Sequence, residues 1–204
     1  MVKTALAVAF ALVLPVSAGL AGATYSLSGS DLIVTVASGE ATLDGSQVSA
    51  SVRNIVKRGA GDLRSTPLPD YAGDFTVAGG CLVVDNRHDL GRDNVGTVFV
   101  GDGGTLRHAQ TWGDWGDYLT TGKTFVFSGG PAAGYEAKFG RWAADCTSGR
   151  ANGGRLSRFV FADDATFHSG AERLKFGGTL DLGGHEISND VSYVASGYDW
   201  LIDL

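Results

Sequence analysis

The sequence contains very few cysteine and histidine residues, which limits the metal sites that it can build. There are two cysteines and four histidines among 204 residues, and the histidines share no common spacing. A structural zinc site takes four Cys or His ligands, usually in closely spaced pairs. We therefore predict no metal site and no cofactor.

The two cysteines, Cys81 and Cys146, leave two alternatives open. In an oxidising compartment they would form a disulfide, and closing a loop of this length is worth about 4 kcal/mol in the chain-entropy model. If their Cα atoms lie more than about 7 Å apart, they stay separate thiols. Their spacing in the sequence does not distinguish the two.

Basic residues are in the minority and are scattered. The chain has 16 Lys and Arg against 22 Asp and Glu, with a formal net charge of −6 at pH 7. Nucleic-acid binding depends on clustered Lys and Arg side chains that neutralise phosphates. We therefore expect no nucleic acid among its partners.

Only one long apolar run is present, at the N-terminus. Lys3 precedes a nearly uninterrupted apolar segment over residues 4–16, and Ala21-Gly22-Ala23 has the small-x-small pattern of a cleavage site. These features predict a signal peptide over residues 1–23 and a secreted or cell-surface protein. The alternative, a membrane anchor, would need roughly 20 apolar residues. No later segment qualifies, so we expect no membrane span after signal removal and a single domain over 24–204.

Helix patterns are nearly absent as well. No long stretch repeats apolar residues at helical spacing, and 31 glycines are spread along the chain, each unfavourable inside a helix. Short β-branched or aromatic runs bounded by Gly, Asp, Asn or Ser are frequent instead, which predicts an all-β fold. These runs are Leu32–Val36, Phe75–Val77, Leu82–Val84, Val98–Val100, Phe125–Phe127, Phe159–Phe161 and Leu180–Leu182.

Paired glycines predict how the strands are arranged. Gly-Gly pairs start at 79, 103, 129, 153 and 177, which is 24 to 26 residues apart. Near-constant spacing in this range is typical of stacked supersecondary units. We therefore predict a parallel β-helix, or β-solenoid, and keep a β-sandwich of hairpins as the alternative. The side chains expected to point into the solenoid core are Leu82, Val84, Val98, Val100, Leu106, Leu180 and Leu182.

One stretch of the chain resembles a known repeat. It has a Lys-x-Gly-x-Gly-x-Leu opening, a Tyr-x-Gly-x-x-x-Val middle and a Gly-x-Leu close. The matching residues are Lys57, Gly59, Gly61, Leu63, Tyr71, Gly73, Val77, Gly80 and Leu82. This pattern is similar to the autotransporter-associated β-strand repeat. The resemblance implies a right-handed parallel β-helix of the kind found in secreted passenger regions, with no catalytic residues to carry over.

Two features depart from that family. Arg64 and Ser65 stand where the repeat usually has a second apolar position. The chain also ends at Leu204 without the outer-membrane barrel of autotransporters. We therefore expect a stand-alone or truncated exported protein.

Acidic turns are the main candidates for chemistry. Asp163 and Asp164 are neighbours in a turn, where two carboxylates of unlike pKa would serve as acid and base on a glycosidic bond. Asp is also an ordinary turn residue, and we favour that interpretation. Asp85–Asp89 and Gly101–Gly104 offer oxygen ligands for calcium but lack the register of a calcium loop. We therefore predict no catalytic residues.

An aromatic-rich stretch interrupts the repeat, and we expect an insertion near 108–145. Aromatic rings beside Asp and Gly would stack on sugar rings while carboxylates bind hydroxyl groups. Alternatively, the rings pack against the solenoid, where their large apolar area is stabilising. The residues expected to contact a ligand are Trp112, Asp114, Trp115, Asp117 and Tyr118.

These features together predict a secreted, noncatalytic structural or adhesin-like surface protein. Its expected partners are cell-surface glycans or a neighbouring cell surface. The alternatives are a carbohydrate-active enzyme, either a polysaccharide lyase or a hydrolase, on the same scaffold, and a carbohydrate-binding module.

Overall fold

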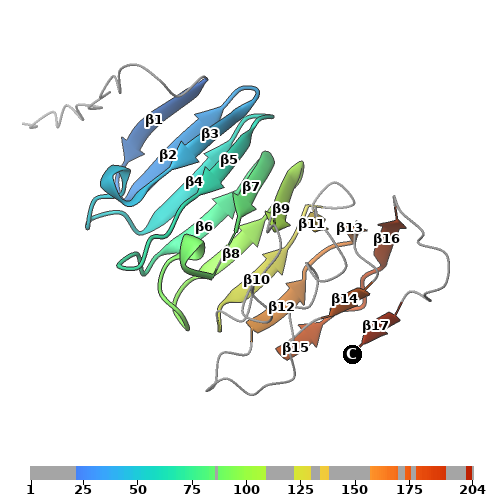
Figure 1. Ribbon diagram of the computed structural model, residues 1–204. Coiled ribbons are helices and arrows are strands. Elements are labelled where there is room, and N and C mark those ends of the chain that lie inside the picture. The colour runs from blue at the N-terminus through green and yellow to red at the C-terminus, as the bar shows by residue number, and fades with distance from the viewer. Residues whose placement is uncertain are drawn as a thin grey trace, which may run out of the picture.

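The computed structural model describes residues 22–85, 87–108, 122–129, 134–137, 157–169, 173–175, 178–191 and 201–203. Within them the chain forms an eight-stranded sheet (sheet A), a seven-stranded sheet (sheet B) and a two-stranded sheet. Figure 1 shows the strands stacked in chain order along one axis, with the blue N-terminal strands at one end and the red C-terminal strands at the other.

The strands alternate between the two large sheets. Sheet A contains, in spatial order, β1 (Ala23–Ser28), β2 (Asp31–Val36), β4 (Asn54–Arg58), β6 (Asp74–Val77), β8 (Thr97–Val100), β10 (Thr124–Phe127), β12 (Ser157–Phe161) and β15 (Gly178–Asp181). Sheet B contains β3 (Glu40–Leu43), β5 (Asp62–Ser65), β7 (Gly80–Val84), β9 (Gly104–His108), β11 (Gly134–Ala137), β13 (Ala165–Ser169) and β16 (Ile187–Val191). The remaining elements are β14 (Arg173–Lys175), β17 (Leu201–Asp203) and the short 3-10 helices η1 (Gly45–Gln47) and η2 (Arg87–Leu90).

This topology is a parallel β-solenoid, as the glycine spacing predicted. Each coil supplies one strand to sheet A and the next to sheet B, and every described strand pair is parallel except β1 with β2. The sandwich alternative is wrong, because strands that follow one another, such as β6 and β7, lie in different sheets and do not form hairpins.

The core is built from rows of side chains that repeat from coil to coil. Strand alternation turns every second residue inward, and the parallel register places equivalent residues beside one another. One inward row of sheet A is Leu32, Ile55, Phe75, Val98, Phe125 and Phe159, and the sheet B row facing the same core includes Ala41, Leu63, Leu82 and Leu106. All of these side chains are buried. The rings of Phe125 and Phe159 stack with their centroids 5.1 Å apart.

Most of the predicted inward residues are confirmed. Five of them are fully buried, namely Leu82, Val84, Val98, Val100 and Leu106. Leu180 is in register with Phe159 of the inward row, although its side chain lies outside the described part. Leu182 was predicted wrongly: it is 39% exposed. The reason is that β15 ends at Asp181, so Leu182 begins a turn and no longer follows the strand alternation.

The two kinds of connection between the sheets differ in length. Turns from sheet A to sheet B (the A-to-B turns) are short, and connections from sheet B back to sheet A (the B-to-A connections) are longer. The former include 37–39, 59–61, 78–79, 101–103 and 162–164, and the latter 44–53, 66–73, 85–96, 109–123 and 138–156. Because all the coils run in the same direction, each kind of connection lies along its own edge of the solenoid.

The expectation of one insertion near 108–145 has to be corrected. β10 and β11 lie within that range and continue both sheets, pairing with the strands of the coils before and after them. The extra length therefore falls into two B-to-A connections, which contain the undescribed segments 109–121 and 138–156. The β-branched and aromatic run Thr124–Phe127 is the local signal for this additional coil.

The N-terminal end of the solenoid is covered by β1. This strand runs antiparallel to β2, and Tyr25 packs against the core. The Tyr25 hydroxyl donates a hydrogen bond of 3.1 Å to the Thr42 carbonyl on β3, so the side chain crosses from sheet A to sheet B over the first coil. Terminal units of repeat proteins need such a cover because no further coil buries their apolar face.

The opening motif of the repeat forms a corner held by a buried lysine. Lys57 lies in an inward row between Val34 and Val77 and is fully buried. Its Nζ donates to the carbonyl oxygens of Arg58 at 3.0 Å, Gly59 at 2.8 Å and Gly79 at 2.9 Å. The lysine therefore ties two successive A-to-B turns together. Burial lowers the pKa of this amine.

A second buried lysine, Lys123, lies at the opposite edge, and its Nζ donates to the Val95 carbonyl. Burial lowers the pKa of Lys123 to about 8, against 10.5 in an unfolded chain. Between these values the unfolded chain binds a proton that the folded chain lacks, so stability should rise with pH from about 8 to 10. Above that window the half-buried Tyr25 and the buried Tyr71, whose pKa values are raised by burial, act in the opposite direction.

Urea unfolding at a series of pH values checks this prediction. Lys123→Met should reduce the slope of stability against pH between about 8 and 10. It should not abolish the slope, because Lys57 contributes in the same direction. A wild-type stability that is flat or falls across this window would contradict the assignment.

Candidate functional site

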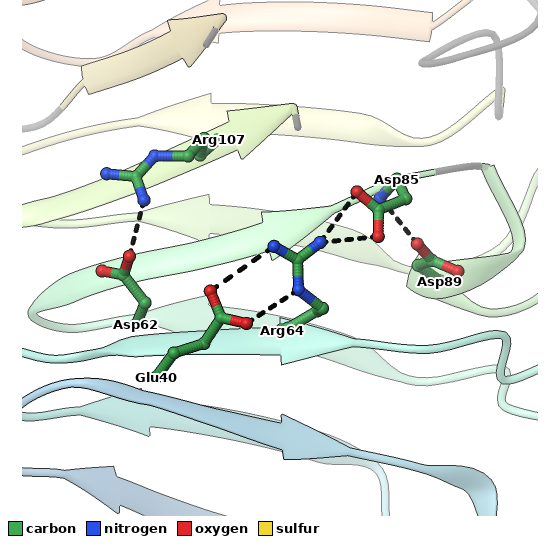
Figure 2. A network of polar contacts seen from close by, with 6 residues as sticks. All are labelled: Glu40, Asp62, Arg64, Asp85, Asp89 and Arg107. Atoms are coloured by element: carbon green, nitrogen blue, oxygen red, sulfur yellow. Dashed lines mark hydrogen bonds and ion pairs between the residues drawn. The ribbon is translucent and has the colours of Figure 1, made fainter. Parts of the chain in front are cut away.

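Charged side chains gather on the outer face of sheet B, across the first coils (Figure 2). Arg64 on β5 lies between Glu40 on β3 and Asp85 just after β7. Its Nε is 2.9 Å from a Glu40 oxygen and its NH1 is 2.6 Å from a carboxylate oxygen of Asp85. The hydrogen bonds that Arg64 donates to Glu40 and Asp85 raise the pKa of its guanidinium above the usual value. One guanidinium thus joins three consecutive coils.

A second ion pair on this face passes over an intervening strand. The NH1 atom of Arg107 on β9 lies 2.5 Å from the Oδ2 atom of Asp62 on β5, and β7 is the strand between β9 and β5. The outward residues of β7 beneath this pair are Cys81 and Val83, with 4% and 1% exposure. The arginine and aspartate side chains therefore help to shield an apolar patch on the outside of the sheet.

Cys81 is thus a buried residue on the outer side of β7. Cys146, its partner in the disulfide alternative, lies outside the described residues. The two alternatives, a disulfide and two separate thiols, therefore stay open.

The two segments considered for calcium have other roles. The Asp85 carboxylate accepts hydrogen bonds from Arg64, and Asp89 Oδ2 accepts the Asp85 backbone N–H at 2.7 Å. In the turn 101–103, backbone groups are used between coils: Gly80 N–H donates to the Gly103 carbonyl at 2.9 Å. Asp85 and Gly103 therefore join neighbouring coils, and Asp89 holds its own connection together.

Asp163 and Asp164 form the A-to-B turn after β12, and the fold adds a histidine to them. His185 belongs to the next A-to-B turn, which follows β15, the neighbour of β12 in sheet A. His185 Nδ1 lies 3.6 Å from Asp164 Oδ1. One potential ligand atom from each of the three side chains lies within 4.8 Å of the other two.

Backbone hydrogen bonds orient both carboxylates. Asp163 Oδ1 accepts the Asp164 N–H at 2.9 Å, and Asp164 Oδ1 accepts the Glu186 N–H at 2.9 Å. The second bond crosses from one coil to the next. Asp163 and His185 are half-buried and Asp164 is exposed.

The predicted ligand-binding residues lie outside the described part of the chain. Trp112, Asp114, Trp115, Asp117 and Tyr118 all fall within 109–121. This segment belongs to the B-to-A connection between β9 and β10. Earlier coils carry η1 and η2 in the equivalent connections.

Sequence reasoning missed the residues that bring coils together, chiefly Glu40, Asp62, Arg64, Arg107 and His185. Arg64 was noticed only as a departure from the repeat. Its partner Glu40 is 24 residues earlier, close to one coil, and Asp62 is 45 residues before Arg107, close to two coils. Pairs of oppositely charged residues separated by about one or two coil lengths were therefore the sequence signal for these ion pairs.

Comparison with protein-family models, with curated proteins and with solved structures gives no match. Within the described residues, no helix is both long and apolar enough to cross a membrane.

Proposed function

We propose that this chain is an exported, noncatalytic surface protein in which the β-solenoid serves as a scaffold and the B-to-A connections contact a ligand. The proposal joins a predicted signal peptide over residues 1–23 to a solenoid of stacked coils. In adhesin-like proteins of this kind, the repeated core supplies rigidity and the connections supply recognition.

The proposal that the protein is noncatalytic rests on the contacts that its carboxylates make. Asp85 pairs with Arg64, Asp62 pairs with Arg107, and Asp164 accepts a backbone N–H of the next coil. Each of these carboxylates holds one coil to another. A glycosidase instead needs an acid kept protonated in an apolar site beside a second carboxylate.

The lengths of the connections support placing the ligand contacts on one edge. The first three A-to-B turns contain only Gly, Ala and Ser. The B-to-A connections vary in length, and one of the longest contains Trp112, Trp115 and Tyr118. Aromatic rings with acidic neighbours suit binding to sugar rings and their hydroxyl groups. Glycans of a cell surface are therefore the proposed partner.

Binding of the purified protein to a glycan array tests this function. The double substitution Trp112→Ala and Trp115→Ala should abolish glycan binding while the circular dichroism spectrum and melting temperature stay unchanged. Phe99→Ala is the matched control, because Phe99 is an exposed aromatic residue on the outer face of sheet A. The control should bind as wild type does. Wild-type protein that binds no glycan, or a double variant that binds normally, would contradict the proposal.

The competing function is a carbohydrate-active enzyme, and the closeness of Asp163 to Asp164 is the observation that favours it. Incubation with a panel of acidic and neutral polysaccharides distinguishes the two. We expect no turnover. Turnover that disappears in Asp163→Asn or Asp164→Asn would establish the enzymatic alternative.

A further inference from the structure

The sequence predicted no zinc site because its histidines and cysteines are not closely spaced. The solenoid changes this, because residues separated by one coil become neighbours. Asp163 and Asp164 lie in one A-to-B turn and His185 in the next, on strands that are adjacent in sheet A. Adjacent strands are about 4.8 Å apart, so side chains from the two turns reach the same point.

The composition of these turns differs from that of the first three A-to-B turns. The turns 37–39, 59–61 and 78–79 contain only small residues without metal-binding side chains. The turns 162–164 and 182–186 lie along the same edge and supply three carboxylates and one imidazole, of which Asp163, Asp164 and His185 come together. The three potential ligand atoms lie within 4.8 Å of one another. Small rotations of half-exposed side chains would bring them to about 3.5 Å, the separation of ligands around a zinc ion with bonds near 2.1 Å.

We propose that Asp163, Asp164 and His185 bind one divalent zinc ion that links the last two A-to-B turns of the described solenoid. The mixed donor set determines the choice of metal, because imidazole favours zinc over calcium or magnesium and carboxylates complete its ligand set. Three protein ligands leave a fourth position for water or for a carboxylate or hydroxyl group of a ligand.

The hydrogen bonds around the site support this role. The Asp164 N–H holds Asp163 Oδ1, and the Glu186 N–H holds Asp164 Oδ1. Such bonds from the surrounding backbone orient carboxylate ligands and reduce the ordering that binding requires. The zinc ion neutralises the repulsion between two adjacent carboxylates. It also joins the coil of β12 to that of β15 by coordination as well as by strand pairing.

An ion pair between protonated His185 and Asp164, at 3.6 Å, is the simpler role for the same residues. The two roles differ in their response to metal. A zinc site gives a melting temperature that rises with zinc and falls on chelation, because an ion bound only by the folded state stabilises that state. An ion pair alone gives a melting temperature that does not respond to zinc.

Isothermal titration of the metal-free purified protein with zinc chloride tests the proposal. We expect one zinc ion per chain and an affinity at least tenfold weaker in Asp164→Asn and in His185→Gln. The Asn side chain keeps the oxygen that accepts the Glu186 N–H, so this variant removes the charge and spares the turn. Cobalt(II) titrated into the same protein should give visible absorption bands of a site with a nitrogen ligand, and His185→Gln should remove them.

Two control variants show whether binding belongs to this site. Asp102→Asn removes an exposed aspartate from an earlier A-to-B turn, and His88→Gln removes a histidine from η2. Both should bind zinc as wild type does. Absence of zinc binding, binding that survives both site substitutions, or equal losses in the controls would overturn the proposal.

Discussion

Replacing Gly59 with alanine should destabilise the solenoid by about 3 kcal/mol or more, the sum of two separate costs. Gly59 has φ +80, a region in which a residue with a side chain loses about 1–2 kcal/mol. In addition, a Cβ at this position would lie 2.3 Å from the Val36 carbonyl oxygen of the preceding coil. Overpacking adds about 1–3 kcal/mol even where side chains can move, and here the obstacle is backbone.

Gly39 supplies the matched control for this prediction. It lies in the preceding A-to-B turn with φ +72, and a Cβ there would meet nothing within 4 Å. Gly39→Ala should therefore cost only the conformational part, about 1–2 kcal/mol. Urea unfolding followed by circular dichroism measures both variants. Equal losses in the two would show that contact with the neighbouring coil is not what restricts position 59.

Replacing Lys57 with methionine should lower the free energy of unfolding by about 3 kcal/mol, because three part-buried carbonyl oxygens lose their shared donor. Methionine has a similar length and no N–H groups, so it fills the space without satisfying the carbonyls of Arg58, Gly59 and Gly79. A buried acceptor left without a partner costs about 1–3 kcal/mol, and the lower end of this range applies to these part-buried carbonyls.

An opposing contribution has to be weighed against this loss. Burial lowers the pKa of Lys57, so keeping its charge inside the solenoid is unfavourable, and methionine removes that cost. Because three carbonyl oxygens lose their donor and only one charge is removed, we expect a net loss of stability. Arg58→Met is the control, since Arg58 is exposed on the same strand and should change stability by less than about 0.5 kcal/mol. A Lys57→Met variant as stable as wild type would show that the buried charge outweighs the three hydrogen bonds.

Both predictions explain residues that the sequence presented only as a motif. The resemblance to the autotransporter-associated repeat drew attention to Lys57, Gly59 and Gly61 without giving a reason for them. In the solenoid each has one: the lysine satisfies corner carbonyls, and a Cβ at Gly59 or at Gly61 would collide with the preceding coil, for Gly61 at 2.7 Å from the Gly39 carbonyl oxygen. The family itself stays an expectation from that resemblance.

The pattern of residues within a strand predicted the direction of its side chains wherever that direction depends on the strand alone. Phe125 and Phe127 are two residues apart in one strand, so both rings point to the same side, and both are buried. Leu182 looked like a continuation of such a strand, but β15 ends at Asp181 and the turn begins at Leu182. Strand ends depend on how the chain meets the next coil, which alternation does not record.

The sequence by itself determined that this chain is all-β, that its strands stack as repeated units, and which face of β7, β8 and β9 is buried. The exact coil length was not determined, because paired residues of neighbouring parallel strands are between 19 and 34 residues apart. Alternation and spacing are patterns within the sequence itself, so they can be recognised without knowing which strand lies beside which. Only the tertiary structure decided that Arg64 joins Glu40 to Asp85, that Arg107 reaches Asp62, and that His185 lies beside Asp163 and Asp164. These contacts join different coils, and which residues face each other there depends on the length of every intervening connection.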